Sequence, residues 1–469
     1  MGKRKRKPQG EMWIPTREMP RVAGHPFYKR LNGVLSEHGF DGFVEEVCAE
    51  QYAEKMGRPS IPPAAYFRML LVGYFEGIDS ERGIAWRCAD SLALREFLGY
   101  ELSQGTPDHS SVSRTRRRLD LETHQAVFGW VLRVLAQEGL LTGKTVGVDA
   151  STLEANAAMR SIVRRDTGAS YDEYLEELAK ASGISTPTRA DLAKIDRKRP
   201  RKGSNDDWKH PHDPDARITK MKDGRTHMGY KAEHAVDLDT GAVMAVTVQA
   251  GSDGDTKTLW NTITEAADQL ERVREDPSAA EGLSADVLKE LILDKGYHSN
   301  EVLAELAEWE IRTYISEPDR GRRRWKGKDD VRDQVYANRR RVREKRGKWL
   351  LRLRGELLER PFAHYLDRGG MRRVHLRGGE NIWKRLLIHV AGCNLGLVMR
   401  QRLGHGTPRA LRGARTFHQA LQWALLHLHR LYRRALRLGR ALAVVVGSIR
   451  LASSETSFRP SWMAFATGC

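Results

Sequence analysis

The feature that most constrains this chain is an apolar run that ends on a carboxylate. Leu291-Ile292-Leu293 is followed at once by Asp294, and a glycine stands two residues later at Gly296. This pattern predicts a buried strand that delivers an acid to the edge of a sheet, with a turn behind it. Aspartates at strand ends also form turns, so Asp294 gains meaning only if other acids are placed to meet it.

A second acid stands in a similar position. The stretch from Lys144 to Thr152 is typical of a short strand that ends at Asp149. The simpler interpretation is that Asp149 caps a helix predicted from Leu153 to Arg164. If the two strands are neighbours in one sheet, however, Asp149 and Asp294 lie side by side. Close carboxylates repel, so such a pair shares a proton or binds cations.

Oxygen ligands of this kind suit Mg²⁺ or Mn²⁺. A third acid from a helix would complete a site for two metal ions. Such a site activates an attacking oxygen and steadies the leaving one during in-line displacement at phosphorus. Acids next to a nucleic acid would repel it without the metals.

The charge of the chain favours a polyanionic partner. The 469 residues carry a formal net charge of +18, and the isoelectric point is near 9.8. Nucleic acid fits better than an anionic membrane, because basic residues gather in an Arg-rich helix after Asp108 and, with aromatic residues, in segment 317–348. For the Arg-rich helix, the alternative is a plain helical bundle with a solvated basic face. For segment 317–348, the alternative is a run of charged residues that contacts only solvent. The candidate DNA contacts are Arg114, Arg116, Arg117, Arg118, Arg322, Arg323, Arg324, Trp325, Lys326, Arg339, Arg340 and Arg341.

The order of predicted elements gives an α/β fold with a mixed sheet flanked by helices. Strands are predicted at 227–237, 242–249, 287–294 and 311–315, and helices at 256–273 and 301–309. An all-helical N-terminal domain precedes the sheet, and further helices follow it. The predicted parts are a basic arm (1–40), a helical and DNA-binding domain (41–140), a sheet domain (141–400) with a polar insertion (165–229) and the basic segment 317–348, and a basic helical region (401–469).

The cysteines and apolar stretches predict a cytoplasmic protein without a membrane partner. Four cysteines are scattered with no CxxC spacing, which is typical of a reducing compartment. The basic N-terminus has no apolar core of the kind a secretory signal needs. The apolar stretches Leu386–Met399 and Ala441–Ile449 are too short to cross a bilayer.

These motifs together resemble those of the DDE transposases of bacterial insertion sequences, in the IS-five-like group with a helical N-terminal domain. The resemblance covers roughly residues 40–400. It depends on Pro107-Asp108-His109-Ser110, Val148-Asp149-Ala150-Ser151-Thr152-Leu153-Glu154-Ala155-Asn156, Gly229-Tyr230-Lys231 with His234 and Asp237, Asp294-Lys295-Gly296-Tyr297, Glu359-Arg360-Pro361-Phe362-Ala363-His364 and Asn394-Leu395-Gly396.

The resemblance implies a ribonuclease-H-like catalytic domain. Asp149 would be the first acid, Asp294 the second and Glu359 the third, and together they would hold two Mg²⁺ (or Mn²⁺) ions. Activated water would cut DNA at the terminal inverted repeats of the element, and the freed 3′-hydroxyl would attack target DNA. Joining two ends implies a homodimer.

The third acid has a rival in Glu356. The general pattern of the class is Tyr, two residues, Arg, three residues, Glu, six residues, Lys. Trp349, Arg352 and Glu356 match this spacing with an aromatic substitute, but Ala363 stands in place of the Lys.

Glu359 matches the surrounding motif better, although Arg354 lies five residues upstream rather than four. Pro361 predicts a kink or an end of the helix near Glu359, because proline removes a backbone donor and clashes with the preceding turn. We therefore predict Glu359 as the third acid, with Glu356 as the alternative.

Three further polar residues stand near the predicted site, and two of them have two interpretations. Tyr297 and His298 follow the second acid and could contact a phosphate or brace the turn. Asp255 is predicted to cap the helix at 256–273. The function also has alternatives: a ribonuclease-H-like nuclease that cuts DNA without strand transfer, or an inactive copy that only binds DNA.

Overall fold

The computed structural model describes residues 24–52, 60–199, 202–221, 224–319, 321, 323–412 and 425–428. The chain divides into two units, residues 1–409 and 410–469. Most of the predicted C-terminal region and the first 23 residues of the predicted basic arm lie outside the described residues.

The first part of the chain is helical, as predicted. Its elements are α1 (Pro26–Glu37), α2 (Phe40–Val47), η2 (Ala49–Gln51), α3 (Pro63–Glu76), α4 (Glu81–Asp90), α5 (Leu92–Phe97), α6 (His109–Arg118) and α7 (Leu121–Gln137). Helix α3 begins at a proline, whose fixed φ suits the first helical turn, and ends at Gly77 in the left-handed region with φ 68°. It is buried on every side from Ala64 to Phe75. A helix this apolar belongs in a core.

A mixed sheet follows. Its strands are β1 (Thr145–Glu154), β4 (Arg217–Lys220), β5 (Thr226–Asp237), β6 (Val243–Ala250), β7 (Glu290–Leu293) and β8 (Arg312–Ile315). β1 pairs antiparallel with β5 and parallel with β7, and β7 pairs parallel with β8. β4 and β6 both pair antiparallel with β5, along different parts of its length. β5 to β8 lie within about three residues of their predicted bounds.

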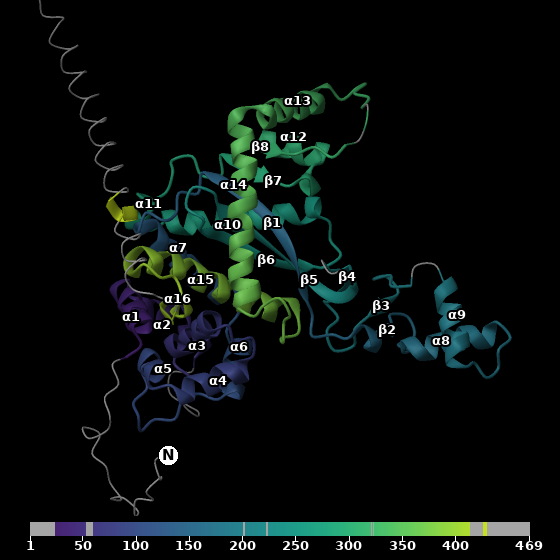
Figure 1. The fold of residues 1–469 in the computed structure, drawn as a ribbon, viewed down its shortest axis with the longest axis horizontal. Coiled ribbons are helices and arrows are strands. Elements are labelled where there is room, and N and C mark those ends of the chain that lie inside the picture. The colour runs from purple at the N-terminus through teal and green to yellow at the C-terminus, as the bar shows by residue number, and fades with distance from the viewer. Residues whose placement is uncertain are drawn as a thin grey trace, which may run out of the picture. The chain divides into compact units, whose positions relative to one another are not determined.

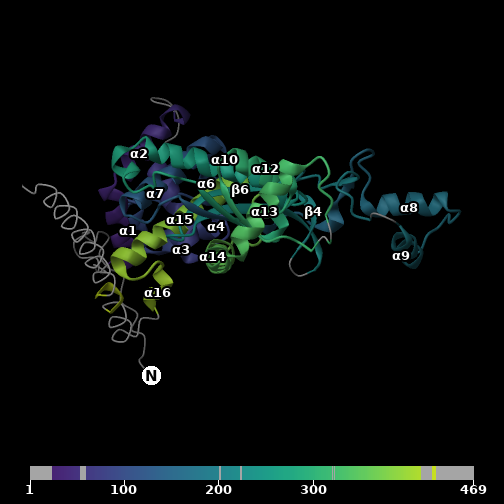
Figure 2. The same ribbon diagram turned by 90° about the horizontal axis from the view of Figure 1, so that it is seen from above.

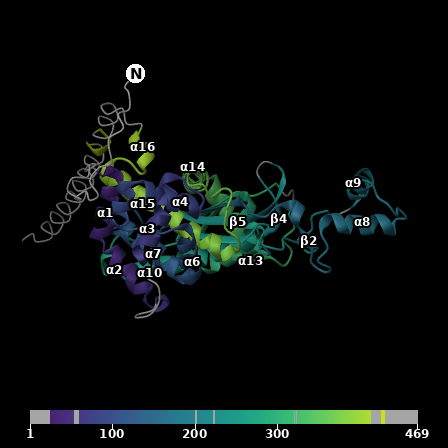
Figure 3. The same ribbon diagram turned by 90° about the horizontal axis from the view of Figure 1, so that it is seen from below.

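Helices cover both faces of the sheet. α10 (Asp255–Arg274) lies on one face and α14 (Lys345–Phe362) on the other, with the strands between them (Figures 1, 2 and 3). α12 (Asn300–Glu308) and α13 (Asp329–Arg343) pack at the β8 edge, and α15 (Gly379–Leu403) packs against α3, α7 and β6. The remaining short elements are η3 (Met159–Ser161), α11 (Pro277–Ala280), η4 (Lys295–Tyr297), η5 (Ala363–Arg368) and α16 (Pro408–Arg412). The predicted mixed α/β architecture is confirmed.

The predicted helix from Leu153 to Arg164 is wrong. β1 instead continues to Glu154, because β5 is long enough to pair with it as far as Glu154↔Gly229. Since the pairing with β7 stops at Val148, the ladder with β5 alone outweighs the helix-capping character of Ser151 and Thr152. Asp149 therefore lies inside a strand and caps no helix.

The polar insertion has a small core of its own. It holds β2 (Val163–Arg164), β3 (Trp208–Lys209), α8 (Tyr171–Ala181) and α9 (Arg189–Lys198). Trp208 is buried there against Tyr171 and Tyr174, and Arg164 stacks over Tyr174. The predicted insertion (165–229) extends too far, because its last residues form β4 and the start of β5 and so belong to the main sheet.

Helix α14 passes through Pro361 and ends at Phe362, three residues after Glu359, so Glu359 lies within the helix and close to its end, as predicted. The helix then widens into the π-type turn η5. Pro361 has no N–H to donate to the residue four positions earlier, and the wider turn accommodates that missing bond.

In the described part of the chain, one helical stretch, Gly379–Leu411, is long and apolar enough to cross a bilayer, so the segment predicted from Leu386 to Met399 belongs to a longer helix. Most of its apolar window is buried inside the protein. Its packing on α3, α7 and β6 identifies it as a core helix of this fold.

Candidate active site

The two predicted aspartates lie next to each other on the sheet. β1 and β7 run parallel with Val148 opposite Leu293, so Asp149 and Asp294 take the next places on neighbouring strands. The side chain of Asp149 is 22% exposed and that of Asp294 is 53% exposed. The juxtaposition depends on the parallel pairing of two strands that are far apart in the sequence.

Helix α14 is held close over these acids by a glycine in β1. A Cβ placed on Gly147 would lie 2.6 Å from Leu358 Cδ1. Leu358 is fully buried, so the helix rests on the strand at this point. Gly147 and Asp149 share a face because strand side chains alternate. The helix thereby places Arg354 and Glu359, which flank Leu358, near the aspartates.

Arg354 bridges the two aspartates. Its Nη2 lies 3.1 Å from Asp149 Oδ2, and its Nη1 lies 3.9 Å from Asp294 Oδ1. The Arg354 side chain is 13% exposed. The two carboxylates thus already share one cation.

The electrostatics of Asp149 bring Glu359 into the same cluster. Burial raises the pKa of Asp149, Arg354 opposes this rise, and the charges of Glu359 and Asp294 add to it. Glu356 is not among the largest influences on the pKa of Asp149. It pairs with Arg360 on the helix surface and is 57% exposed. Glu359 as the third acid therefore stays a prediction, supported by its influence on the pKa of Asp149.

Among the described residues, no group of three or more Asp, Glu, His or Cys side chains is arranged to hold a metal ion. The donors nevertheless have the chemistry for a hard cation. Asp149 and Asp294 present carboxylate oxygens, and Arg354 shows that one positive charge can contact both. These residues fit the predicted ligands in chemical type.

His234 fixes the end of α14 against the sheet. It is the β5 partner of Asp149 in the strand register. Its ring stacks on Phe362 at 3.8 Å between centroids, and its Nδ1 lies 2.9 Å from the Tyr365 hydroxyl. Burial, aided by the charge of Arg354, lowers the pKa of His234 to about 3, so the ring is neutral at pH 7. His234 is a packing residue of this site.

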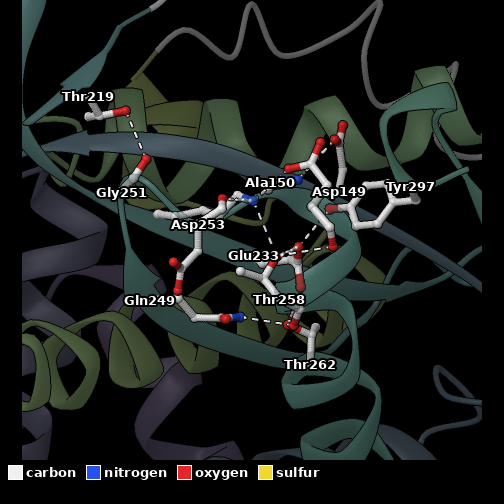
Figure 4. A network of polar contacts seen from close by, with 12 residues as sticks. Asp149, Ala150, Thr219, Glu233, Gln249, Gly251, Asp253, Thr258, Thr262 and Tyr297 are labelled. Carbon is white, nitrogen blue, oxygen red and sulfur yellow. Dashed lines mark hydrogen bonds and ion pairs between the residues drawn. The ribbon is translucent and has the colours of Figure 1, made fainter. Parts of the chain in front are cut away.

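The turn that follows Asp294 is braced from the opposite face of the sheet (Figure 4). Glu233 is fully buried and accepts hydrogen bonds from Thr258 Oγ1 at 2.8 Å, Thr262 Oγ1 at 2.6 Å and the Tyr297 hydroxyl at 2.7 Å. Burial raises the pKa of Glu233, and its donors partly offset the rise. Since Tyr297 belongs to η4, directly after Asp294, the network anchors the second acid.

An ion pair supports the same turn. Lys231 Nζ lies 2.6 Å from Asp255 Oδ1, and a Cβ on Gly296 would lie 2.5 Å from Asp255 Oδ2. Gly254 is the N-cap of α10, so Asp255 is its first residue and not its cap as predicted. Sequence reasoning missed Glu233 and the Lys231–Asp255 pair as supports. The available signal was a pair of charged residues, Lys231 and Glu233, inside a stretch predicted as a strand.

The two predicted residues after Asp294 are buried. Tyr297 and His298 are each 1% exposed. The hydrogen bond from Tyr297 to Glu233 matches the bracing alternative. Neither side chain lies on the surface that a phosphate would reach in this structure.

Helix α6 divides its arginines between surface and interior. Asp108 caps the helix by accepting from the Ser111 N–H at 2.7 Å. Arg116 is 6% exposed, and its Nε donates to Glu81 at 2.8 Å. The other three predicted contacts, Arg114, Arg117 and Arg118, are exposed. Arg116 therefore joins α6 to α4, and only the others face solvent.

Segment 317–348 shows the same division. Arg339 forms two hydrogen bonds to Glu317 at 2.5 and 2.9 Å, and Arg323 pairs with Glu317 at 2.7 Å. Arg341 donates to Thr313. The exposed members are Arg324, Lys326 and Arg340, and Trp325 is half-buried near Tyr336. Arg322 lies outside the described residues.

Comparison with protein families gives two matches. A family described as Transposase DDE domain matches residues 161–395, which is half of the chain, and a family described as Transposase domain (DUF772) matches residues 18–118. The first span begins after Asp149 and includes Asp294 and Glu359. No curated protein and no solved structure matches the chain.

Proposed function

The chain belongs to the DDE transposase family, and on that premise we propose that it cuts DNA at the ends of an insertion sequence and joins the freed 3′-hydroxyl to target DNA. The reaction would be two successive in-line displacements at phosphorus. In the first, water attacks a phosphodiester and the 3′-oxygen leaves. In the second, that 3′-hydroxyl attacks a target phosphodiester and a second 3′-oxygen leaves.

The sheet supports a ribonuclease-H-like catalytic domain. Its strand order runs β6, β5, β1, β7, β8, with the first three antiparallel and the last three parallel. Helices lie on both faces. Ligands of open α/β sheets bind beyond the carboxyl ends of parallel strands, and Asp294 follows β7 at that end.

The observation that carries the proposal is the placement of Asp149, Asp294 and Glu359. Two neighbouring strands and one helix packed on them present three carboxylates, and Arg354 already lies between two of these. We propose that the three acids hold two Mg²⁺ or Mn²⁺ ions. When bound, such ions supply Lewis-acid activation of the attacking oxygen and stabilisation of the leaving one.

The protein's own part would be positioning. β1 and β7 fix the spacing of the aspartates, Gly147 sets how closely α14 approaches, and the Glu233–Tyr297 bond holds the turn after Asp294. Such positioning matters because a misplacement of about 1 Å in a reacting group can cost on the order of 100-fold in rate.

DNA would lie along the exposed basic residues. Arg114, Arg117 and Arg118 on α6 and Arg324, Lys326 and Arg340 near α13 are free of the buried contacts that occupy Arg116, Arg339 and Arg341. Contacts of this type bind the phosphate backbone and make affinity fall steeply with salt. We propose that two copies of the chain act together, because two element ends must be joined.

The test is a strand-transfer assay with a pre-cleaved element end, taken from the DNA that flanks the gene, in the presence of Mg²⁺. We expect both cleavage of the intact end and joining of the pre-cleaved end, and we expect Asp294→Asn to lose both while it still binds DNA. Cleavage without joining would favour the nuclease. Binding without either reaction in the unmodified protein would favour an inactive copy.

A further inference from the structure

Arg354 lies between the two carboxylates that would hold a metal ion. Its guanidinium lies 3.1 Å from Asp149 and 3.9 Å from Asp294. A divalent ion held by the same two carboxylates would lie about 2.0–2.1 Å from their oxygens. The guanidinium and an ion bridging the two acids cannot both occupy this space.

Ion pairs with the two aspartates hold the Arg354 side chain in its position. Within the described residues, Arg354 forms ion pairs with Asp149 and Asp294 alone, and its buried Nε has no hydrogen-bond partner. Its neighbours on α14 behave differently. Arg352 is exposed and forms no ion pair with the described residues, and Arg360 pairs with Glu356.

The acids in turn depend on this cation when no metal is bound. Asp149 is largely buried beside Asp294, and two close carboxylates repel. Removing one partner of a buried ion pair leaves an uncompensated charge, which is strongly destabilising. Arg354 supplies the compensating charge from the same helix that carries Glu359.

We propose that Arg354 is a built-in competitor for the metal site: it holds Asp149 and Asp294 together in the metal-free protein and must leave them when divalent ions bind. This proposal rests on the proposed metal site. Its consequence is that the free protein binds divalent ions weakly, so that the site is filled only when Arg354 has moved away.

The experiment measures Mn²⁺ binding to the full chain without DNA, by calorimetry and by the loss of the free-ion electron paramagnetic resonance signal. Arg354→Gln is compared with Arg352→Gln, which removes the same charge two residues away on the exposed side of α14. We expect Arg354→Gln to bind Mn²⁺ on the order of ten-fold more tightly than Arg352→Gln, a difference of about 1.4 kcal/mol. Equal or weaker binding by Arg354→Gln would overturn the proposal.

Two further measurements keep the outcomes distinct. In EDTA, Arg354→Gln should unfold at a lower temperature than Arg352→Gln, and Mn²⁺ should recover more of that loss; an equal response to Mn²⁺ in both variants would count against the proposal. If Arg354→Gln does not fold, two variants replace it. They are Arg354→Ala, prepared in the presence of Mn²⁺, and Arg354→Lys, which keeps the positive charge. Arg354→Lys should bind Mn²⁺ as weakly as the unmodified protein.

A blank variant separates this proposal from the proposed function. Asp149→Asn with Asp294→Asn removes both carboxylates and should bind no Mn²⁺ at the site. Were every form, including the unmodified chain and Arg354→Gln, to bind Mn²⁺ no better than this blank, the metal site itself would be refuted. Specific binding that is unchanged by Arg354→Gln would refute only the competition.

Discussion

Substituting Gly147 by alanine should damage the site without touching any of its acids. The new Cβ would lie 2.6 Å from Leu358 Cδ1 and 3.1 Å from Leu238 Cδ2, whereas ordinary contacts begin near 3.4 Å. Leu358 is fully buried and cannot turn into solvent, so α14 must move away by about 0.8 Å. Overpacking of this kind costs about 1–3 kcal/mol. That exceeds the roughly 0.4–1 kcal/mol by which replacing glycine with alanine stabilises a chain where it fits.

The same shift would carry Glu359 away from Asp149. Cleavage should therefore fall on the order of 100-fold, which is the effect of a displacement of about 1 Å. The assay combines cleavage of a flanking element end with urea unfolding. Leu358→Val removes the clashing Cδ atoms and serves as the compensating change, so the double variant should recover most of the lost cleavage. Full activity and stability in Gly147→Ala, or no recovery in the double variant, would refute the packing argument.

Three other predictions concern the helical part and the basic segment. Asp108→Ala should lower the free energy of unfolding by about 1 kcal/mol, the usual effect of losing an N-cap, and Asp108→Asn should lose much less. Burial lowers the pKa of His124 to about 4, so the unfolded state takes up a proton that the folded state refuses as pH falls below 6.5. The unmodified protein should thus lose about 1 kcal/mol more stability than His124→Gln between pH 6.5 and 5.5, and parallel pH profiles would contradict this. Arg340→Gln should reduce the salt dependence of DNA binding by roughly one phosphate contact. Arg339→Gln should leave that slope unchanged and destabilise the protein, because Arg339 is paired with Glu317.

The strands and helices that follow the insertion could be predicted from the sequence because their periodicity is local. In β5, apolar residues partly alternate with polar ones, and β6 is mostly apolar. The turn between the two strands ends at Gly241, and α10 has an apolar face at helical spacing. The length of β1 could not be predicted in this way. Its second half is made of helix-capping and polar residues, and only the long partner strand β5 keeps it extended.

The positions of the two aspartates in the candidate site could be predicted from the sequence, but the side-chain contacts between them could not. Asp149 and Asp294 each follow an apolar run, which is a local signal. The bridge made by Arg354 depends on where α14 crosses the sheet, and that crossing is set by the bare surface of Gly147. The same reason explains why Arg116 and Arg339 were predicted as DNA contacts. Their acidic partners lie on other elements, so a count of basic residues cannot separate buried arginines from exposed ones.

The central claim is that α14 brings Glu359, and not Glu356, to the two aspartates. The most direct test compares the Mg²⁺-dependent cleavage rates of Glu359→Gln and Glu356→Gln on one flanking element end, with DNA binding measured for both. Glu356 forms an exposed pair with Arg360, which contributes little. We predict that Glu359→Gln loses at least about 100-fold in rate with DNA binding intact, because a metal ligand contributes several kcal/mol to the transition state. Glu356→Gln should stay within about two-fold of the unmodified protein. The opposite result, with cleavage lost in Glu356→Gln and kept in Glu359→Gln, would contradict the account.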